Sequence, residues 1–453
     1  LKGERVLVEV SGAAASAVPT EAGAEGKKSK KGKRFLRGKV IDVLKPSGER
    51  IVPACEVFGR CGGCQLQHVN YYAQLQIKEE IVRDTLRRLG GFTEIKVQPV
   101  IGMVDPWGYR NKGHFQVGLQ QGRIRLGFFE EGSHCLVAEP CRHLFSVKVT
   151  ALVQFLEEVL TAYQVKVADT AAGVPGLRYV LVRESRATGE IVIVLIYSGP
   201  YSDKKAEIAR EIAGKFPEVV GVCQNRNTRA AGTVLGNEFG GNSGNIVGSA
   251  DKSAQIEVIW GRDWLEDRIG PFSYVISPAS FFQVNSVQTA VLYEKALEYA
   301  ALTGGEEVVD AYCGIGTISL FLAQRARKVT GIEIVSAAVA DAQKNAARNG
   351  VGNVEFLQGK AEVLLPQMAA QGTRPQVVVV DPPRKGCDRA LLDSIIKVAP
   401  ERVVYVSCNP ATLARDQRYL VDGGGYAVRE VQPVDMFPQT GHVETVVLMS
   451  RVK

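Results

Sequence analysis

The sequence has no apolar stretch long enough to cross a lipid bilayer, and no secretory signal pattern opens it. It also lacks the dense cysteines of a small disulfide-stabilised secreted protein, because its nine cysteines are spread over 453 residues. An odd number of cysteines, several of them clustered, instead indicates a reducing compartment and a metal-binding or catalytic use. We therefore expect a cytoplasmic protein with no membrane partner.

The composition is that of a folded protein with several domains. A chain of this length has room for about three domains, and a hydrophobic content of 45% excludes wholesale disorder. The net charge of +7 includes a dense basic run at 27–34, which is either a solvated loop or a contact for a polyanion. Because the first residue is Leu1 and not Met, we expect the natural chain to begin further upstream.

The apolar pattern divides the chain into three parts. Alternating segments at 5–10 and 38–44 predict strands of a small β-barrel in residues 1–52. Residues 53–265 are typical of an α+β domain, and residues 266–453 alternate between strands and helices, which predicts a doubly wound parallel α/β sheet. The expected strands are 114–119, 179–183, 190–196, 307–310, 328–333, 354–357, 376–380 and 402–406, and the expected helices are 69–90, 317–325 and 336–349.

A turn with two glycines joins the first strand of the C-terminal part to its first helix. Its sequence, Asp-Ala-Tyr-Cys-Gly-Ile-Gly-Thr at 310–317, lets the backbone approach a ligand closely. Glu333 ends the next strand, where a carboxylate can bind ribose hydroxyls. The three-glycine spacing of NAD-binding proteins is absent, so the turn favours S-adenosylmethionine, with a purely structural turn as the alternative. Asp381-Pro382-Pro383-Arg384 ends the fourth strand, either beside this donor or as a structural strand end.

Cys408 follows the strand at 402–406 in the sequence Ser407-Cys408-Asn409-Pro410. A thiolate that adds to C6 of a uracil ring makes C5 nucleophilic enough to take a methyl group, and a base must then remove the C5 proton. Glu444 is the candidate base, and Asp381 could polarise the uracil or hold the donor. The alternatives are a buried apolar cysteine and an exposed glutamate at a strand end.

Three cysteines, Cys55, Cys61 and Cys64, form a cluster in which a Gly-Gly pair lets the chain wrap around a bulky object. Cys135 and Cys141 follow much later, and one of them can complete a set of four thiolates. The spacing does not distinguish zinc from an iron–sulfur cluster, but it differs from the C-x3-C-x2-C run of radical S-adenosylmethionine enzymes. Four protein ligands would leave no open iron, which favours a structural role.

Together these motifs resemble the RNA uracil-C5 methyltransferase family over nearly the whole chain. Within that family, the resemblance is greatest to the iron–sulfur members that methylate a uridine of 23S ribosomal RNA. The most specific stretches are CGGC at 61–64, SFFQVN at 280–285, VSCNPATLARD at 406–416 and DMFPQTGHVE at 435–444.

The resemblance implies a domain and a role for each motif. Residues 1–52 would form a TRAM-type (OB-like) β-barrel, 53–265 an α+β middle domain that carries the cluster, and 266–453 a Rossmann-like class I methyltransferase domain. The implied residues are Gln283, Tyr312, Thr317, Glu333 and Asp381 for S-adenosylmethionine, Cys408 as nucleophile, Glu444 as base, and Cys55, Cys61, Cys64 and Cys141 for a [4Fe-4S] cluster, with Cys135 unused. Two features depart from the family: the barrel looks truncated, and Lys360 stands where an Asn or Asp often contacts adenosine.

The expected function is therefore methylation of C5 in a specific uridine of 23S ribosomal RNA during rRNA processing, by a monomeric RNA-binding enzyme. One rival is the same chemistry on transfer RNA. A second is a non-catalytic RNA-binding assembly factor, which an intact Cys408 and Glu444 pair argues against. An amino-group methyltransferase is a third rival, but it would need an aromatic residue after the Pro-Pro pair, where this chain has Arg384.

Overall fold

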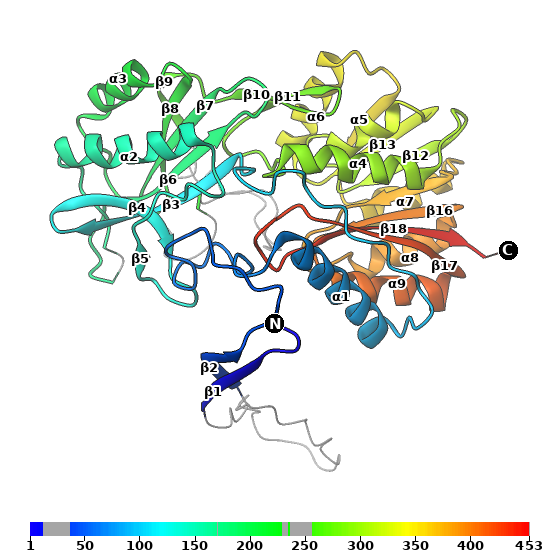
Figure 1. Ribbon diagram of the computed structural model, residues 1–453. Coiled ribbons are helices and arrows are strands. Elements are labelled where there is room, and N and C mark those ends of the chain that lie inside the picture. Colours follow the sequence, from blue (N-terminus) through cyan, green and yellow to red (C-terminus); the bar gives the residue numbers. More distant parts are fainter. Residues whose placement is uncertain (12–36, 170, 229–233, 236–255, 453) are drawn as a thin grey trace, which may run out of the picture.

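The computed structural model describes residues 1–11, 37–169, 171–228, 234–235 and 256–452. Within these residues, two seven-stranded sheets with helices form the two halves of the molecule, and a two-stranded sheet lies near the N-terminus (Figure 1). No helix in the described ranges is long and apolar enough to cross a membrane. The basic run at 27–34 and the Gly/Asn-rich stretch at 236–248 both lie outside the described residues.

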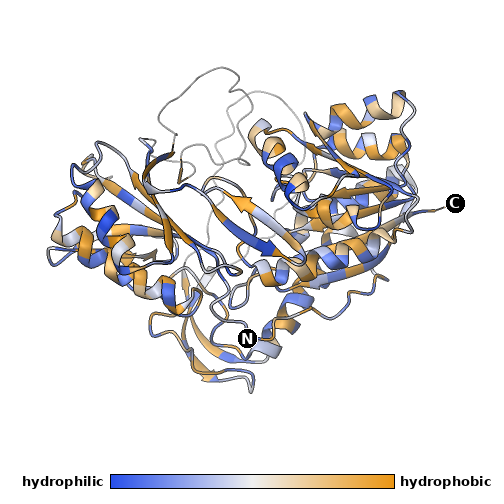
Figure 2. Cartoon of the chain, turned by 90° about the horizontal axis from the view of Figure 1, so that it is seen from above, coloured by the Kyte–Doolittle hydropathy of each residue, from blue (hydrophilic) through white to orange (hydrophobic). Residues whose placement is uncertain are grey.

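The C-terminal sheet has the strand order β14-β13-β12-β15-β16-β18-β17, in which β18 runs in the opposite direction to the other six strands. The strands are β12 (Glu307–Ala311), β13 (Lys328–Glu333), β14 (Val354–Gln358), β15 (Val377–Val380), β16 (Arg402–Ser407), β17 (Tyr426–Val434) and β18 (Glu444–Arg451). The five strands predicted here are confirmed, whereas β17 and β18 were not predicted. Both sheets are coloured largely as hydrophobic in Figure 2, as strands covered by other elements require.

Helices cover both faces of this sheet. Alternate residues of β15 point to opposite faces, so that Val377 and Val379 join one hydrophobic cluster while Val378 and Val380 join another. The first cluster contains α4 (Ser286–Ala300), α5 (Thr317–Ala323) and α6 (Ser336–Arg348), and the second contains α1 (Tyr71–Gly90), α7 (Ala361–Ala370), α8 (Arg389–Val398) and α9 (Pro410–Gly424). The doubly wound α/β architecture predicted from the sequence is confirmed.

The predicted helix at 69–90 forms as α1. The Asn70 side chain caps its first turn by accepting a hydrogen bond from the Ala73 N–H, and Gly91 ends it in a left-handed conformation (φ 69°). Val82 and Leu86 pack against the C-terminal sheet, beside α9. α1 thus belongs by sequence to the second part of the chain but packs against the sheet of the third part.

The second sheet has the order β5-β4-β3-β6-β7-β8-β9. Its strands are β3 (Lys112–Gln120), β4 (Arg123–Phe129), β5 (Leu136–Val137), β6 (Leu177–Glu184), β7 (Ile191–Tyr197), β8 (Val219–Arg226) and β9 (Ile256–Gly261). One face packs against α2 (Val147–Ala162) and α3 (Lys205–Lys215). The predicted strands at 114–119, 179–183 and 190–196 are confirmed as β3, β6 and β7, while the domain boundaries stay a prediction.

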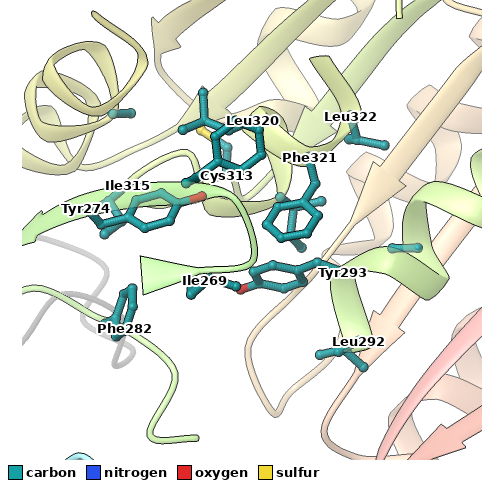
Figure 3. Packing of buried hydrophobic residues seen from close by; sticks show 14 of the residues in the cluster. Ile269, Tyr274, Phe282, Leu292, Tyr293, Cys313, Ile315, Leu320, Phe321 and Leu322 are labelled. Carbon is teal, nitrogen blue, oxygen red and sulfur yellow. The ribbon is translucent and has the colours of Figure 1, made fainter. Parts of the chain in front are cut away.

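The other face of the second sheet shares a continuous core with the C-terminal half. Val192 and Val194 of β7 belong to the same cluster as Tyr274, Tyr293 and Phe321. Figure 3 shows the Tyr293 and Phe321 rings close together, with centroids 5.5 Å apart. Tyr274 lies on the hairpin of β10 (Leu265–Ile269) and β11 (Phe272–Ile276), between the two halves in Figure 1. This shared core joins the two halves into one body.

The N-terminal β-barrel is not confirmed. The described part of residues 1–52 forms two antiparallel strands, β1 (Arg5–Ser11) and β2 (Arg37–Lys45). Several of their apolar residues, such as Leu7 and Val10, are more than half exposed. Glu4 accepts two hydrogen bonds from the Arg50 guanidinium and thereby fastens this hairpin to the chain that follows it.

Candidate active site

The edge of the C-terminal sheet brings Cys408 and Glu444 together. β16 and β18 are antiparallel neighbours, and their register pairs Ser407 with Thr445. Cys408 follows Ser407 and Glu444 precedes Thr445, so the two residues stand opposite each other where the strand pairing ends. Cys408 is partly exposed, whereas Glu444 is only 4% exposed. Glu444 is therefore a buried carboxyl beside a thiol, and not an exposed strand end.

Asn409 and Pro410 shape the turn that presents Cys408. Pro410 is the first residue of α9, and the Asn409 side chain caps the helix by accepting a hydrogen bond from the Ala411 N–H at 3.1 Å. The Ser407 hydroxyl accepts from the Asn409 N–H at 3.1 Å. Cys408 thus lies immediately before a helix N-terminus, whose partial positive charge favours a thiolate.

Two carboxyls next to Cys408 titrate near neutral pH. Burial, with Glu444 and Asp381, raises the pKa of the Cys408 thiol to about 11, and Arg384 opposes this rise. Burial and Asp381 likewise raise the pKa of Glu444 to about 8, again against Arg384. The pKa of Asp381 is raised by burial to about 7. Carboxyls perturbed in this way are suited to proton transfer near pH 7.

The loop that carries Arg384 is fastened to the start of α9. The Arg384 carbonyl accepts a hydrogen bond from the Asn409 side chain at 3.0 Å, and the Asp416 carboxylate accepts one from the Cys387 N–H at 2.8 Å. This anchoring keeps the Arg384 guanidinium where its charge acts on Cys408. Sequence analysis assigned Arg384 no role in setting the charge at Cys408, because the motif alone does not show which way its loop folds.

The glycine turn after β12 is closed by the carboxylate predicted to bind ribose. The Gly314 N–H donates to Glu333 Oε2 at 3.1 Å. Gly316 has a φ of 82°, and a Cβ there would lie 2.7 Å from the Phe356 ring, so only glycine fits. Tyr312 also has a left-handed φ of 67°, which is strained for a residue with a side chain.

Four of the five residues predicted for the donor site gather at one edge of the sheet. Tyr312 and Thr317 follow β12, Glu333 ends β13, and Asp381 follows β15, and these three strands are adjacent. Gln283 precedes α4 and is buried. The exposed side chain of Lys360 lies at the same edge, after β14.

Sequence analysis missed Tyr293, which lies between the donor turn and the carboxyls. Its hydroxyl is 3.1 Å from the Thr317 hydroxyl. Burial raises the Tyr293 pKa, and Asp381 and Glu444 are among the charges that raise it further. Tyr293 stands in α4, where it reads as an ordinary apolar position of a helix, so no sequence signal distinguishes it.

All four cysteines predicted to hold the cluster line one cavity of about 80 Å³. They are Cys55, Cys61, Cys64 and Cys141, whereas Cys135 is exposed and does not line it. The Gly63 N–H donates to the Cys61 sulfur at 3.4 Å. In the described parts of the chain, no three Cys, His, Asp or Glu side chains stand close enough to hold a single metal ion, so the predicted cluster is not confirmed.

Comparisons with known proteins agree with this fold. The sequence model for tRNA (uracil-5-)-methyltransferases matches residues 245–452. An RNA methyltransferase of Bacillus cereus is 45% identical over 93% of this chain and 88% of its own length. Another, from Caldanaerobacter subterraneus subsp. tengcongensis, is 43% identical over 100% of this chain and 92% of its own. The tRNA (uracil-54, C5)-methyltransferase of Pyrococcus abyssi, solved with S-adenosyl-L-homocysteine, has a TM-score of 0.70 at 27% identity and covers 91% of this chain and 88% of its own.

The doubly wound sheet with its glycine turn and acidic second strand is that of an S-adenosylmethionine-dependent methyltransferase. The chain belongs to the RNA (uracil-5-)-methyltransferase family, and the protein is an enzyme that acts on RNA.

Replacing Glu444 with Gln should raise the melting temperature, and by more at pH 8.5 than at pH 5. The pKa of Glu444 in the folded protein, about 8, lies above its ordinary value of 4.5. The contribution of the protonated carboxyl to the free energy of unfolding is therefore complete below pH 4.5 and is lost as pH rises through 8. A neutral Gln avoids this loss. Thermal melts across this range check the expectation, with the exposed Glu401→Gln as control, and a pH-independent difference between Glu444→Gln and the unmodified protein would contradict it.

Proposed function

We propose that this enzyme methylates C5 of a uridine in 23S ribosomal RNA through a covalent bond between Cys408 and C6. The observation that carries the proposal is the pairing of β16 with β18, which sets the thiol and the buried Glu444 carboxyl side by side. The donor turn lies at the same sheet edge. A nucleophile, a base and a methyl donor site at the same edge of the sheet are what this reaction needs.

The proposed chemistry assigns one step to each group. The Cys408 thiolate adds to C6, and the electrons of the C5–C6 double bond move toward O4 to give an enolate. C5 then attacks the sulfonium methyl, and S-adenosylhomocysteine leaves. Glu444 takes the proton from C5, and the returning electrons re-form the double bond and expel the thiolate. The Arg384 charge, by opposing the rise of the Cys408 pKa, helps the thiolate form.

Donor binding in the proposal uses the groups at the sheet edge. Glu333 is held by the Gly314 N–H and by the Val335 N–H, at 3.1 and 2.9 Å, which orients its carboxylate toward the turn. The left-handed Gly316 lets the backbone approach the ligand closely. We assign Gln283, Tyr312, Thr317, Glu333 and Asp381 to this site.

We further propose that Cys55, Cys61, Cys64 and Cys141 hold a [4Fe-4S] cluster. Backbone N–H groups assist two of these thiols. The Gly63 N–H donates to Cys61, and the N–H groups of Leu144 and His143 lower the pKa of Cys141 against the rise due to burial, as thiolate ligands need. The Arg110 Nε faces the same cavity region and is buried without a partner. A tetrahedral zinc would hold its sulfurs about 3.8 Å apart, because each Zn–S bond is about 2.3 Å. In the described residues the four cysteines do not stand close enough to hold a single metal ion, and the larger group that we propose would cross-link the two cysteine-bearing segments.

The rest of the proposal concerns the partner RNA and the setting. A TRAM-type barrel in residues 1–52 would hold the phosphate backbone, beside the cluster-bearing domain at 53–265 and the methyltransferase domain at 266–453. We propose a cytoplasmic monomer. The similarity to the Pyrococcus abyssi tRNA enzyme favours transfer RNA as the second candidate substrate.

Loss of the gene should remove 5-methyluridine from one or more positions of 23S ribosomal RNA and leave transfer RNA unchanged. Mass-spectrometric mapping of both RNAs from a deletion strain measures this, and complementation with the Cys408→Ala variant is the control. Loss confined to transfer RNA would replace the proposed target by the second candidate. Unchanged 5-methyluridine in both RNAs would refute the proposal.

RNA that carries 5-fluorouridine at the target should trap the enzyme. The fluorine cannot leave C5 as a proton does, so elimination stops after methyl transfer and the Cys408–C6 bond persists. We expect an adduct that survives denaturant for the unmodified enzyme and for Cys223→Ala, a buried cysteine of the second sheet, and none for Cys408→Ala. An adduct formed by Cys408→Ala would refute the assignment of Cys408 as the nucleophile.

Anaerobically purified protein should contain about four irons per chain and absorb broadly in the visible range. Replacing Cys141 with Ser should abolish both signals, because it lines the cavity, while replacing the exposed Cys135 with Ser should change neither. Iron analysis and absorption spectra test this. Stoichiometric zinc with no iron would refute the cluster.

A further inference from the structure

The segment at 435–443 joins β17 to β18 and leads directly into Glu444. Val434 pairs with Glu444, so the segment is a loop whose ends meet at the active site. We refer to it as the 435–443 loop. In the described part of the chain no hydrogen bond reaches the Glu444 carboxyl itself. Its position is therefore set by the path of the backbone that enters β18.

The first residue of the loop is held by a fully buried ion pair. Asp435 Oδ1 accepts from Lys78 Nζ of α1 at 2.5 Å, and both side chains have 0% exposure. Asp435 Oδ2 accepts from the Tyr71 hydroxyl at 2.9 Å. Lys78 Nζ also donates to the Phe437 carbonyl at 3.0 Å. A buried charge with its partner and further hydrogen bonds tolerates little displacement.

Five consecutive carbonyls of the loop, from Asp435 to Gln439, each accept a hydrogen bond from another element. In chain order the donors are Gln288 Nε2 at 3.3 Å, Asn285 Nδ2 at 3.0 Å, Lys78 Nζ at 3.0 Å, the Tyr109 hydroxyl at 3.1 Å, and the N–H groups of Gln65 and Leu66 at 3.0 Å each. A loop usually satisfies its carbonyls with water or with its own turns. Here every one of the five is fixed from outside.

Gln439 is the second anchor of the loop. Its φ is 69°, a left-handed conformation that costs free energy for a residue other than glycine. Gln74 of α1 holds it there with two side-chain bonds, from its Nε2 to Gln439 Oε1 at 2.9 Å and from the Gln439 N–H to its Oε1 at 3.1 Å. α1 thus fixes the loop at both Asp435 and Gln439.

We propose that Lys78, Asp435 and Gln439 are positioning residues that hold Glu444 where it can take the C5 proton. This inference rests on the proposed function, because it needs a covalent intermediate from which a base removes the C5 proton. None of the three residues is assigned to the chemistry. α1 lies outside the strand–helix repeat, and its contribution to the active site is to fix this loop.

The proposal predicts a loss in one step of the reaction only. Two variants test it: Lys78→Met with Asp435→Asn, which removes both buried charges together, and Gln74→Met, which removes the two bonds to Gln439 without changing charge. Both should be trapped by 5-fluorouridine RNA at the rate of the unmodified enzyme. Their turnover on natural RNA should fall by about tenfold to a hundredfold, since a small misplacement of a catalytic group has that effect.

The intermediate gives a readout that general destabilisation does not change. With natural RNA, both variants should accumulate a methylated, denaturant-resistant complex, as Glu444→Gln should. Arg262→Met with Glu190→Gln removes an ion pair at the ends of β7 and β9 in the second sheet and is the control, which should turn over normally. Normal turnover by both test variants, or a parallel fall of trapping and turnover, would overturn the inference. Failure of the unmodified enzyme to be trapped would instead defeat the proposed function.

Discussion

The active site depends on the reversed direction of one strand. In a parallel sheet, the last residues of all the strands lie at one edge of the sheet, and their first residues lie at the opposite edge. β18 enters the C-terminal sheet antiparallel to β16, so its first residue reaches the edge where β16 ends. Glu444 therefore meets Cys408 although a helix and a strand separate them in sequence. If β18 ran parallel to β16, Glu444 would lie at the far edge of the sheet.

This placement also explains the unusual charge balance of the site. The Glu444 and Asp381 carboxyls lie beside the partly exposed Cys408 thiol. Glu444 raises the pKa of the thiol, and Asp381 raises the pKa of both Cys408 and Glu444. Arg384 is the cation that opposes them, and its loop is fixed to the same helix that starts beside Cys408. The site thus favours neutral forms before substrate binds. Such a site destabilises the folded protein when its carboxyls ionise, a cost that active sites commonly carry.

The sequence predicts the parallel strands well and points to Cys408 as a candidate nucleophile, because each has a local signal. Buried strands are runs of valine, and Cys408 follows one of them beside a helix-starting Asn-Pro. β17 escaped prediction because Pro433 and charged residues interrupt its pattern, which an edge strand tolerates. α7 escaped because Pro366 lies inside it. The partners of the 435–443 loop have no local signal at all, since Lys78 and Asp435 are 357 residues apart in the chain.

The same long-range contacts connect the cysteine cavity to Glu444. The Gln65 and Leu66 N–H groups that hold the Gln439 carbonyl belong to the residues immediately after Cys64, and Tyr109, which holds the Pro438 carbonyl, precedes Arg110 at the cavity wall. A group bound by the four cysteines would fix these donors, because it would tie residues 55–64 to Cys141. Its structural effect would then extend through the 435–443 loop to Glu444. Under the proposed function, a bound cluster would thus assist proton removal without contacting the RNA base, by limiting the movement of the backbone that leads into β18.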